Sequence, residues 1–122
     1  MKVFDVESEE QKSQRLTPAI GSQEWAEVEH DFESGIAAFQ PGQKTRLHIH
    51  TNDQLIYVID GKGIIGTETE QHLATPGKVF VTPKNQKHFQ AASDDMHFTF
   101  LFVQRFPNET KIWDEYVPIT VI

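Results

Sequence analysis

Cysteine is absent from the 122 residues, which excludes disulfide bonds, thiolate zinc sites and a cysteine nucleophile. No apolar run approaches the roughly 18 residues of a membrane span, and the first residues, MKVFDVESEEQKSQRL, lack the apolar core of a signal peptide. Basic residues are few: 11 against 18 acidic residues give a net charge of −7, which repels phosphate backbones and anionic membranes. We therefore expect a soluble cytoplasmic protein that binds neither nucleic acid nor membrane.

Strand patterns dominate the sequence from about residue 24 onward, where short apolar or alternating runs are broken by turn pairs such as Pro41-Gly42 and Pro76-Gly77. The expected strands are 24–29, 35–39, 44–50, 55–60, 63–67, 79–82, 87–92 and 96–104. The pattern predicts an all-β domain over residues 1–122, with a barrel at about 24–104 between an arm, 1–23, and a tail, 105–122. A chain of this length buries a core unaided, so a metal ion would serve function.

The two ends of the chain differ in character. Residues 7–14 are charged without an apolar stripe, which indicates either a frayed arm or a short solvated helix. The tail, YVPITVI over residues 116–122, is apolar to its last residue. We expect it to pack on the barrel or to pair with a second subunit, because exposed sheet edges are usually covered.

Three histidines and a glutamine form the candidate metal site. His48 and His50 lie two residues apart, so on a strand their rings project from the same face. The alternative is that they are merely two polar residues on a strand. Gln54 follows a turn signal, and His88 lies on a separate run that a neighbouring strand could bring alongside. Three imidazoles and one oxygen suit one divalent ion of manganese, iron, nickel, copper or zinc, with two octahedral positions left open.

A family resemblance begins with this histidine pair. Gly42, His48, His50, Gln54 and Gly61, separated by five, one, three and six residues, match the spacing of the first cupin motif. Glutamine stands at position 54, where glutamate is commoner. The spacing of the whole motif is far more specific than the His-x-His pair alone.

A second stretch resembles the second cupin motif. It consists of Gly77, five residues, Pro83, one residue, Asn85, two residues and His88. Asn85 replaces the usual glycine, and Ala92 replaces the usual closing asparagine. The first change is mild, because asparagine tolerates the left-handed backbone conformation that glycine would adopt there.

The resemblance implies a double-stranded β-helix, a jelly-roll-like antiparallel barrel that holds the metal inside and binds a small-molecule ligand or substrate. It also implies a homodimer, which the apolar tail supports. The pattern of three histidines and one glutamine is similar to that of small cupins that open unsaturated uronate sugars and of some polyketide cyclases. It is also similar to small cupins related to carboxymuconolactone decarboxylase partners. The fold alone does not choose among these activities.

The neutral side chain of Gln54 affects the expected chemistry. A carboxylate would cancel one unit of the ion's charge, whereas an amide leaves the full dipositive charge on the site. This favours the polarisation of a carbonyl or hydroxyl group over oxygen chemistry. The alternative is that Gln54 only hydrogen-bonds a histidine ring.

Other residues are candidates for handling substrate or protons. Arg46 shares the strand parity of the histidine pair and could bind a carboxylate, or could lie at the rim and reach solvent. Tyr57 could be a general acid or a packing residue, and His97 a general base or a structural histidine. Gln90 has the parity of His88 and could line the cavity.

The sequence therefore predicts a metal-dependent enzyme that acts on a small oxygenated molecule such as a carboxylate. Isomerisation, ring opening and decarboxylation rank slightly ahead of dioxygenation. The alternatives are a non-catalytic cupin that binds or senses a small ligand, and a purely structural barrel.

Overall fold

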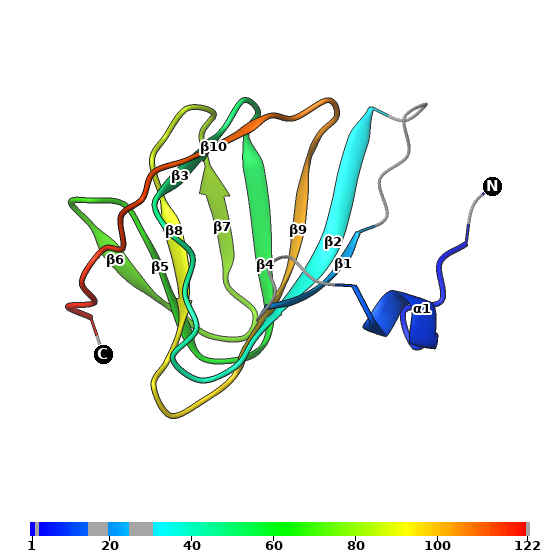
Figure 1. Ribbon diagram of the computed structural model, residues 1–122, viewed down its shortest axis with the longest axis horizontal. Helices are drawn as coiled ribbons and strands as arrows, with labels where there is room; N and C mark the ends of the chain where they lie inside the picture. The colour runs from blue at the N-terminus through cyan, green and yellow to red at the C-terminus, as the bar shows by residue number, and fades with distance from the viewer. Residues whose placement is uncertain (2, 15–19, 25–30, 122) are drawn as a thin grey trace.

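The computed structural model describes residues 1, 3–14, 20–24 and 31–121. Within this part of the chain, strands account for nearly all regular structure, and the helix α1 spans only Glu9–Lys12 (Figure 1). The strands are β1 (Gly21–Glu24), β2 (Phe32–Phe39), β3 (His48–His50), β4 (Gln54–Gly61), β5 (Gly63–Gly66), β6 (Gln71–Ala74), β7 (Val79–Thr82), β8 (Phe89–Ala92), β9 (Phe98–Arg105) and β10 (Thr110–Ile112). The predicted all-β class is confirmed.

The strands form a two-layered jelly roll. One layer is a five-stranded antiparallel sheet in the order β1-β2-β9-β4-β7. The other contains the three-stranded sheet β6-β5-β8 and the pair β10-β3, which face the larger sheet in Figure 1. Among the described residues, hydrogen bonds group the strands into these three sheets, so the barrel-like fold is not one continuously closed sheet.

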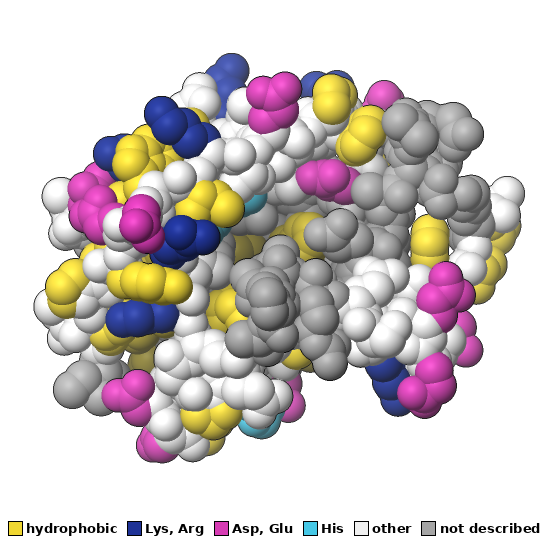
Figure 2. All heavy atoms as spheres, viewed as in Figure 1, with side chains coloured by type: hydrophobic (Ala, Val, Ile, Leu, Met, Phe, Trp, Pro, Cys, Tyr) yellow, Lys and Arg dark blue, Asp and Glu magenta, His cyan; other side chains and the backbone are white. Residues whose placement is uncertain are grey.

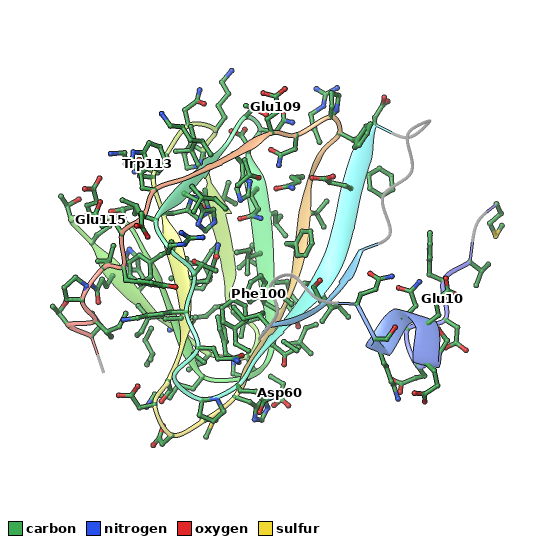
Figure 3. The ribbon with its side chains drawn as sticks, in the orientation of Figure 1. Glu10, Asp60, Phe100, Glu109, Trp113 and Glu115 are labelled. Carbon is green, nitrogen blue, oxygen red and sulfur yellow. The ribbon has the colours of Figure 1, made fainter. Side chains whose placement is uncertain are left out.

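Alternation along the strands places the core between the layers. In β9, Phe98, Phe100 and Phe102 are buried, and the residues between them are partly exposed. The ring of Phe39 on β2 packs at 6.0 Å from Phe98 and at 5.6 Å from Phe100. Figure 3 shows Phe100 inside the jelly roll. Because side chains alternate along a strand, the opposite parity of β9 faces away from the core.

The backbone conformation at two turns explains why Asn85 and Gly61 occupy their motif positions. Asn85 has a φ of 63°, as predicted for the residue that replaces the motif glycine. Gly61 has a φ of 81°, and a Cβ placed there would lie 1.9 Å from the carbonyl oxygen of His97. Gly61 is thus required both by its backbone conformation and by the close approach of the neighbouring chain.

The N-terminal segment contains a single turn of helix rather than a fully frayed arm. Ser8 caps α1 by accepting a hydrogen bond from the backbone N–H of Gln11 at 3.3 Å. Of the predicted strand 24–29, residue 24 ends β1, and residues 25–29 lie outside the described part of the chain. No described helix is both long and apolar enough to cross a membrane.

The tail packs on its own chain. Val117 is buried in a core cluster with Leu47 and Phe89. The Gln71 side chain donates to the carbonyl oxygen of Pro118 at 2.8 Å and accepts from the backbone N–H of Thr120 at 2.8 Å. Of the two predicted positions for the tail, the structure therefore shows packing on the jelly roll.

Candidate metal centre

Strand pairing brings the three predicted histidines together. His48 and His88 pair across an antiparallel bridge in which each backbone N–H donates to the other's carbonyl, at 3.0 and 2.9 Å. Their ring centroids lie 4.2 Å apart, and His50 lies 5.1 Å from each. The candidate ligand nitrogens of all three lie within 4.8 Å of one another. Parity along β3 and the cross-strand bridge together create this convergence.

Backbone carbonyls orient two of the rings. His48 Nδ1 donates to the carbonyl oxygen of Arg46 at 2.7 Å, and His88 Nδ1 donates to that of Gln86 at 2.9 Å. A carbonyl only accepts, so both rings carry their proton on Nδ1. Nε2 is left with a free lone pair, which is the atom and the state that a metal ion requires.

The third ring is positioned by the C-terminal strand. β10 pairs with β3 and sets Thr110 directly opposite His50. His50 Nδ1 lies 3.0 Å from Thr110 Oγ1 and 3.3 Å from Asn108 Nδ2. Sequence reasoning missed both partners, because a threonine and an asparagine in the tail carry no recognisable signal until strand pairing brings them to the histidine.

Gln54 lines the same cavity as His48 and His50, and its amide is held in one orientation. It is only 6% exposed, and its Nε2 donates to Gln104 Oε1 at 3.3 Å, while Gln104 Nε2 donates to Glu33 Oε1. This chain of amides turns Gln54 Oε1 away from Gln104. The bond goes to Gln104 and not to a histidine ring, which was the alternative role for Gln54.

Burial keeps the three imidazoles neutral. Loss of solvent is the main cause and the neighbouring His48 a smaller one, and together they lower the pKa of His88 to about 3 and that of His50 to about 4. Burial also lowers the pKa of His48, against the opposing effect of its bond to Arg46. Near neutral pH all three rings are therefore unprotonated and need release no proton to bind a metal ion.

Unpartnered buried atoms test whether a metal ion fits. His88 is 1% exposed, and its Nε2 has no hydrogen-bond partner; Gln54 Oε1 has none either. Among the described residues, one more buried side-chain atom lacks a hydrogen-bond partner, Oδ1 of Asn108, which lies beside His50. Leaving a buried acceptor unpaired costs about 1–3 kcal/mol. A cation at the histidine group would use lone pairs that are otherwise unsatisfied, so these residues fit a divalent metal ion.

An open cavity of about 540 Å³ adjoins the group. Phe100 and Phe102 form part of its apolar lining, and Thr45, Gln90 and Glu33 contribute polar atoms. Gln90 thus lies where its strand parity predicted. Figure 2 shows the molecule hollowed near the centre of the viewed face, with hydrophobic side chains visible inside. The volume and mixed lining suit a small, partly apolar ligand.

The three residues predicted to handle substrate or protons lie in different places. Arg46 lines the cavity, but its guanidinium is exposed and contacts Asp114 at 3.4 Å. Tyr57 is exposed on the outer face of β4, because it lies an odd number of residues from inward-facing Gln54. His97 precedes inward-facing Phe98 and therefore points outward. The structure does not bring Tyr57 or His97 to the histidine group.

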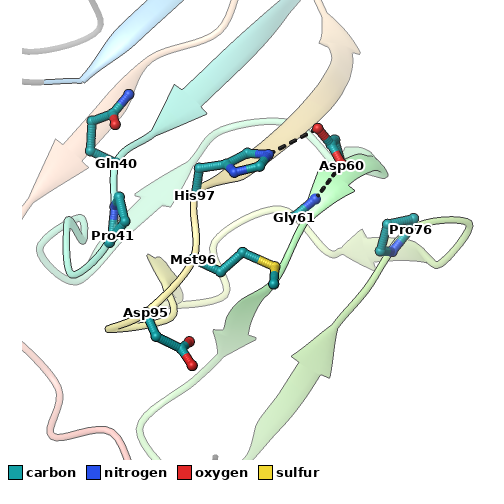
Figure 4. Close-up of a pocket in the computed structure, with 8 residues that line it drawn as sticks. All are labelled: Gln40, Pro41, Asp60, Gly61, Pro76, Asp95, Met96 and His97. Atoms are coloured by element: carbon teal, nitrogen blue, oxygen red, sulfur yellow. Dashed lines mark hydrogen bonds and ion pairs between the residues drawn. The ribbon is translucent and has the colours of Figure 1, made fainter.

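His97 belongs to a shallow depression elsewhere on the surface. Its Nε2 lies 2.9 Å from Asp60 Oδ2, and Asp60 Oδ1 accepts from the backbone N–H of Gly61 (Figure 4). The bond to His97 lowers the pKa of Asp60. Figure 3 shows Asp60 at one end of the jelly roll, apart from Phe100, and Asp60 is not among the residues that line the cavity.

Fold and site together define a jelly-roll protein with a three-imidazole group beside one open cavity. Residues 35–104 match the family model described as Cupin domain. The chain therefore belongs to the cupin family, and the predicted resemblance is confirmed. The comparison with curated proteins found no match.

Solved structures give the same assignment. KdgF from Halomonas sp. is 28% identical, with 77% of this chain and 86% of that chain covered and a TM-score of 0.63. A cupin-like protein from Thermotoga maritima is 21% identical, covers 76% of each chain and has a TM-score of 0.69. The polyketide cyclase RemF from Streptomyces resistomycificus is 17% identical over 84% and 78%, with a TM-score of 0.68. The last two likenesses show the shared fold alone.

Proposed function

We propose that this cupin is a metal-dependent enzyme for a small oxygenated carboxylate, acting by isomerisation, ring opening or decarboxylation. His48, His50, His88 and Gln54 hold one divalent transition-metal ion. The observation that carries the proposal is the pair of buried, unpartnered acceptors, His88 Nε2 and Gln54 Oε1, beside a cavity that admits a ligand.

The ion, when bound, supplies a Lewis acid that polarises an oxygen of the ligand and stabilises the negative charge that develops on it. Gln54 is neutral, so it leaves the full charge of the ion available for this role. Its fixed amide presents only the oxygen, because Nε2 is engaged by Gln104. This combination favours polarisation over the one-electron chemistry of a dioxygenase.

Two residues of the cavity take the remaining roles. Glu33 is the carboxylate among the described residues that line the cavity, and it can accept a proton from a ligand carbon or oxygen and return it. Arg46 lines the cavity, and its guanidinium makes an exposed contact to Asp114, from which a ligand carboxylate can recruit it. A ligand that bridges the metal site and Arg46 would place its reacting carbon between the two.

The first test measures metal content by mass spectrometry in untagged protein, in His48→Ala and in His72→Ala, where the changed histidine is exposed. We expect about one equivalent of a transition metal in the parent and in His72→Ala, and little in His48→Ala. Little metal in all three, even after reconstitution, would contradict the proposal.

The second test measures turnover with the loaded protein. Unsaturated uronates are the first substrates to assay, because the pattern of three histidines and one glutamine resembles that of uronate-opening cupins. Loss of the ultraviolet absorbance of the conjugated carboxylate reports ring opening. A loaded protein that binds such ligands and returns them unchanged would instead be a non-catalytic ligand-binding cupin.

A further inference from the structure

Three polar side chains form a row across β2, β9 and β4, the central strands of the five-stranded sheet. Register sets Glu33 of β2 opposite Gln104 of β9, and Gln104 opposite Gln54 of β4. All three residues line the cavity, and Gln104 and Gln54 are only 7% and 6% exposed. Directly opposite residues of antiparallel strands have their side chains within reach of each other. The sheet therefore holds these groups as one hydrogen-bonded row, which we call the amide row.

The hydrogen bonds of the amide row all run in one direction. Gln54 Nε2 donates to Gln104 Oε1 at 3.3 Å, and Gln104 Nε2 donates to Glu33 Oε1. A row made only of amides could run in either direction, because each amide carries a donor on one side and an acceptor on the other. An ionised carboxylate only accepts. Glu33 therefore requires the nitrogen of Gln104 to face it, and this in turn requires the nitrogen of Gln54 to face Gln104.

A row that ran the other way would not serve a metal ion. It would present Gln54 Nε2, a hydrogen-bond donor, to the cavity that His48 and His50 also line. The site offers acceptors to such a donor, since its unprotonated imidazole nitrogens carry free lone pairs and His88 Nε2 is buried without a partner. The imidazoles alone therefore favour the reversed row, and a group of fixed polarity has to oppose them.

We propose that Glu33 is a positioning residue for the metal ligand Gln54. Acting through Gln104, its carboxylate fixes the direction of the amide row, so that Gln54 Oε1 faces the ion. The proposal rests on the metal site proposed above. A carboxylate ligand has two equivalent oxygens and needs no such orientation, whereas an amide ligand has one oxygen and does. A glutamine at position 54 thus depends on a second polar group that aligns it, and the row supplies that group.

The affinity for Zn²⁺, titrated against a fluorescent competitor in the absence of substrate, tests this proposal. We expect Glu33→Gln to weaken zinc binding about tenfold, because groups that orient metal ligands typically contribute this much. Glu70→Gln is the matched control, since it removes one charge from an exposed position outside the cavity, and it should bind zinc as the parent does. Circular dichroism verifies that each variant is folded.

Two further variants separate orientation from charge. Gln54→Glu supplies a ligand that needs no orientation, so in this background Glu33→Gln should no longer weaken binding. A direct attraction between the Glu33 charge and the ion would persist there. The double variant Glu33→Gln, Gln104→Glu keeps the net charge and moves the carboxylate next to Gln54 Nε2. It should restore most of the affinity, because Glu33 is then not needed to align Gln54.

The outcomes distinguish this proposal from the metal site on which it rests. Equal zinc affinity of the parent and Glu33→Gln, an equal loss in the Gln54→Glu background, or a double variant that binds no better than Glu33→Gln would each overturn the role of Glu33 and leave the metal site in place. A parent that binds no zinc would contradict the metal site itself, and the role of Glu33 with it.

Discussion

A single difference between two amides of this cavity distinguishes the proposed metal ligand, Gln54, from Gln90. Gln54 and Gln90 are both buried and both line it, but only Gln54 has an oxygen without a partner, since Gln90 Oε1 lies 3.4 Å from Thr45 Oγ1. We expect Gln54→Leu to weaken metal binding by about 10- to 100-fold, because the group loses its oxygen ligand. Titration with a fluorescent competitor measures this. Gln90→Leu is the control, and equal losses in both variants would contradict the assignment.

The buried neutral histidine predicts a pH dependence of the metal-free protein. His88 has its pKa lowered to about 3 in the folded state, whereas an unfolded histidine titrates near 6.5. Below pH 6.5 the unfolded chain therefore binds a proton that the folded chain does not. The contribution of neutral His88 to the free energy of unfolding is complete above pH 6.5 and is lost as the pH falls toward 3. Within this window His88 contributes a slope of up to about 1.4 kcal/mol per pH unit.

Denaturant unfolding in the presence of a chelator measures that slope. His88→Asn, which does not titrate, should show a shallower decline of the free energy of unfolding between pH 6.5 and 4. His72→Asn, changed at an exposed position, should decline as the parent does. Parallel curves for the parent and His88→Asn would show that His88 is not held neutral by burial.

Among the strands, β10 positions His50, a proposed metal ligand on β3, although the two strands lie far apart in the sequence. It is three residues long, yet its register sets Thr110 opposite His50. We expect Thr110→Val, which keeps the shape and removes the hydroxyl, to weaken metal binding about tenfold by releasing the His50 ring. Thr110→Ser should restore the affinity, which the same competitor titration measures. A loss that serine does not rescue would assign Thr110 to packing.

For the whole molecule, metal binding and stability are linked. An ion that binds only the folded chain raises the free energy of unfolding by about 2.7 kcal/mol at a concentration 100 times its dissociation constant. We expect a transition-metal ion to raise the melting temperature of the parent by several degrees, and to leave that of His48→Ala unchanged. Calorimetry measures both. An equal rise in both proteins would place the metal outside the histidine group.

Local pattern was sufficient to predict much of the fold and of the candidate site. The turn pairs and alternating runs located most strands. Motif spacing pointed to four residues for the site. The structure groups three of them, His48, His50 and His88, and places Gln54 in the cavity that His48 and His50 also line. β6 was not predicted. Its residues, QHLA, are short and mixed in polarity, so nothing in them marks a strand until β5 pairs with it.

The sequence by itself determined the strand parity, and with it which side chains of one strand share a face, because alternation is a local property of extended backbone. Only the tertiary structure decided which faces look into the cavity, and it turned Tyr57 and His97 outward. It also brought Thr110 to His50, Gln104 to Gln54 and Glu33 to Gln104. These contacts join residues 50 or more positions apart, and cross-strand register is set by the packing of the whole core, which no local pattern contains.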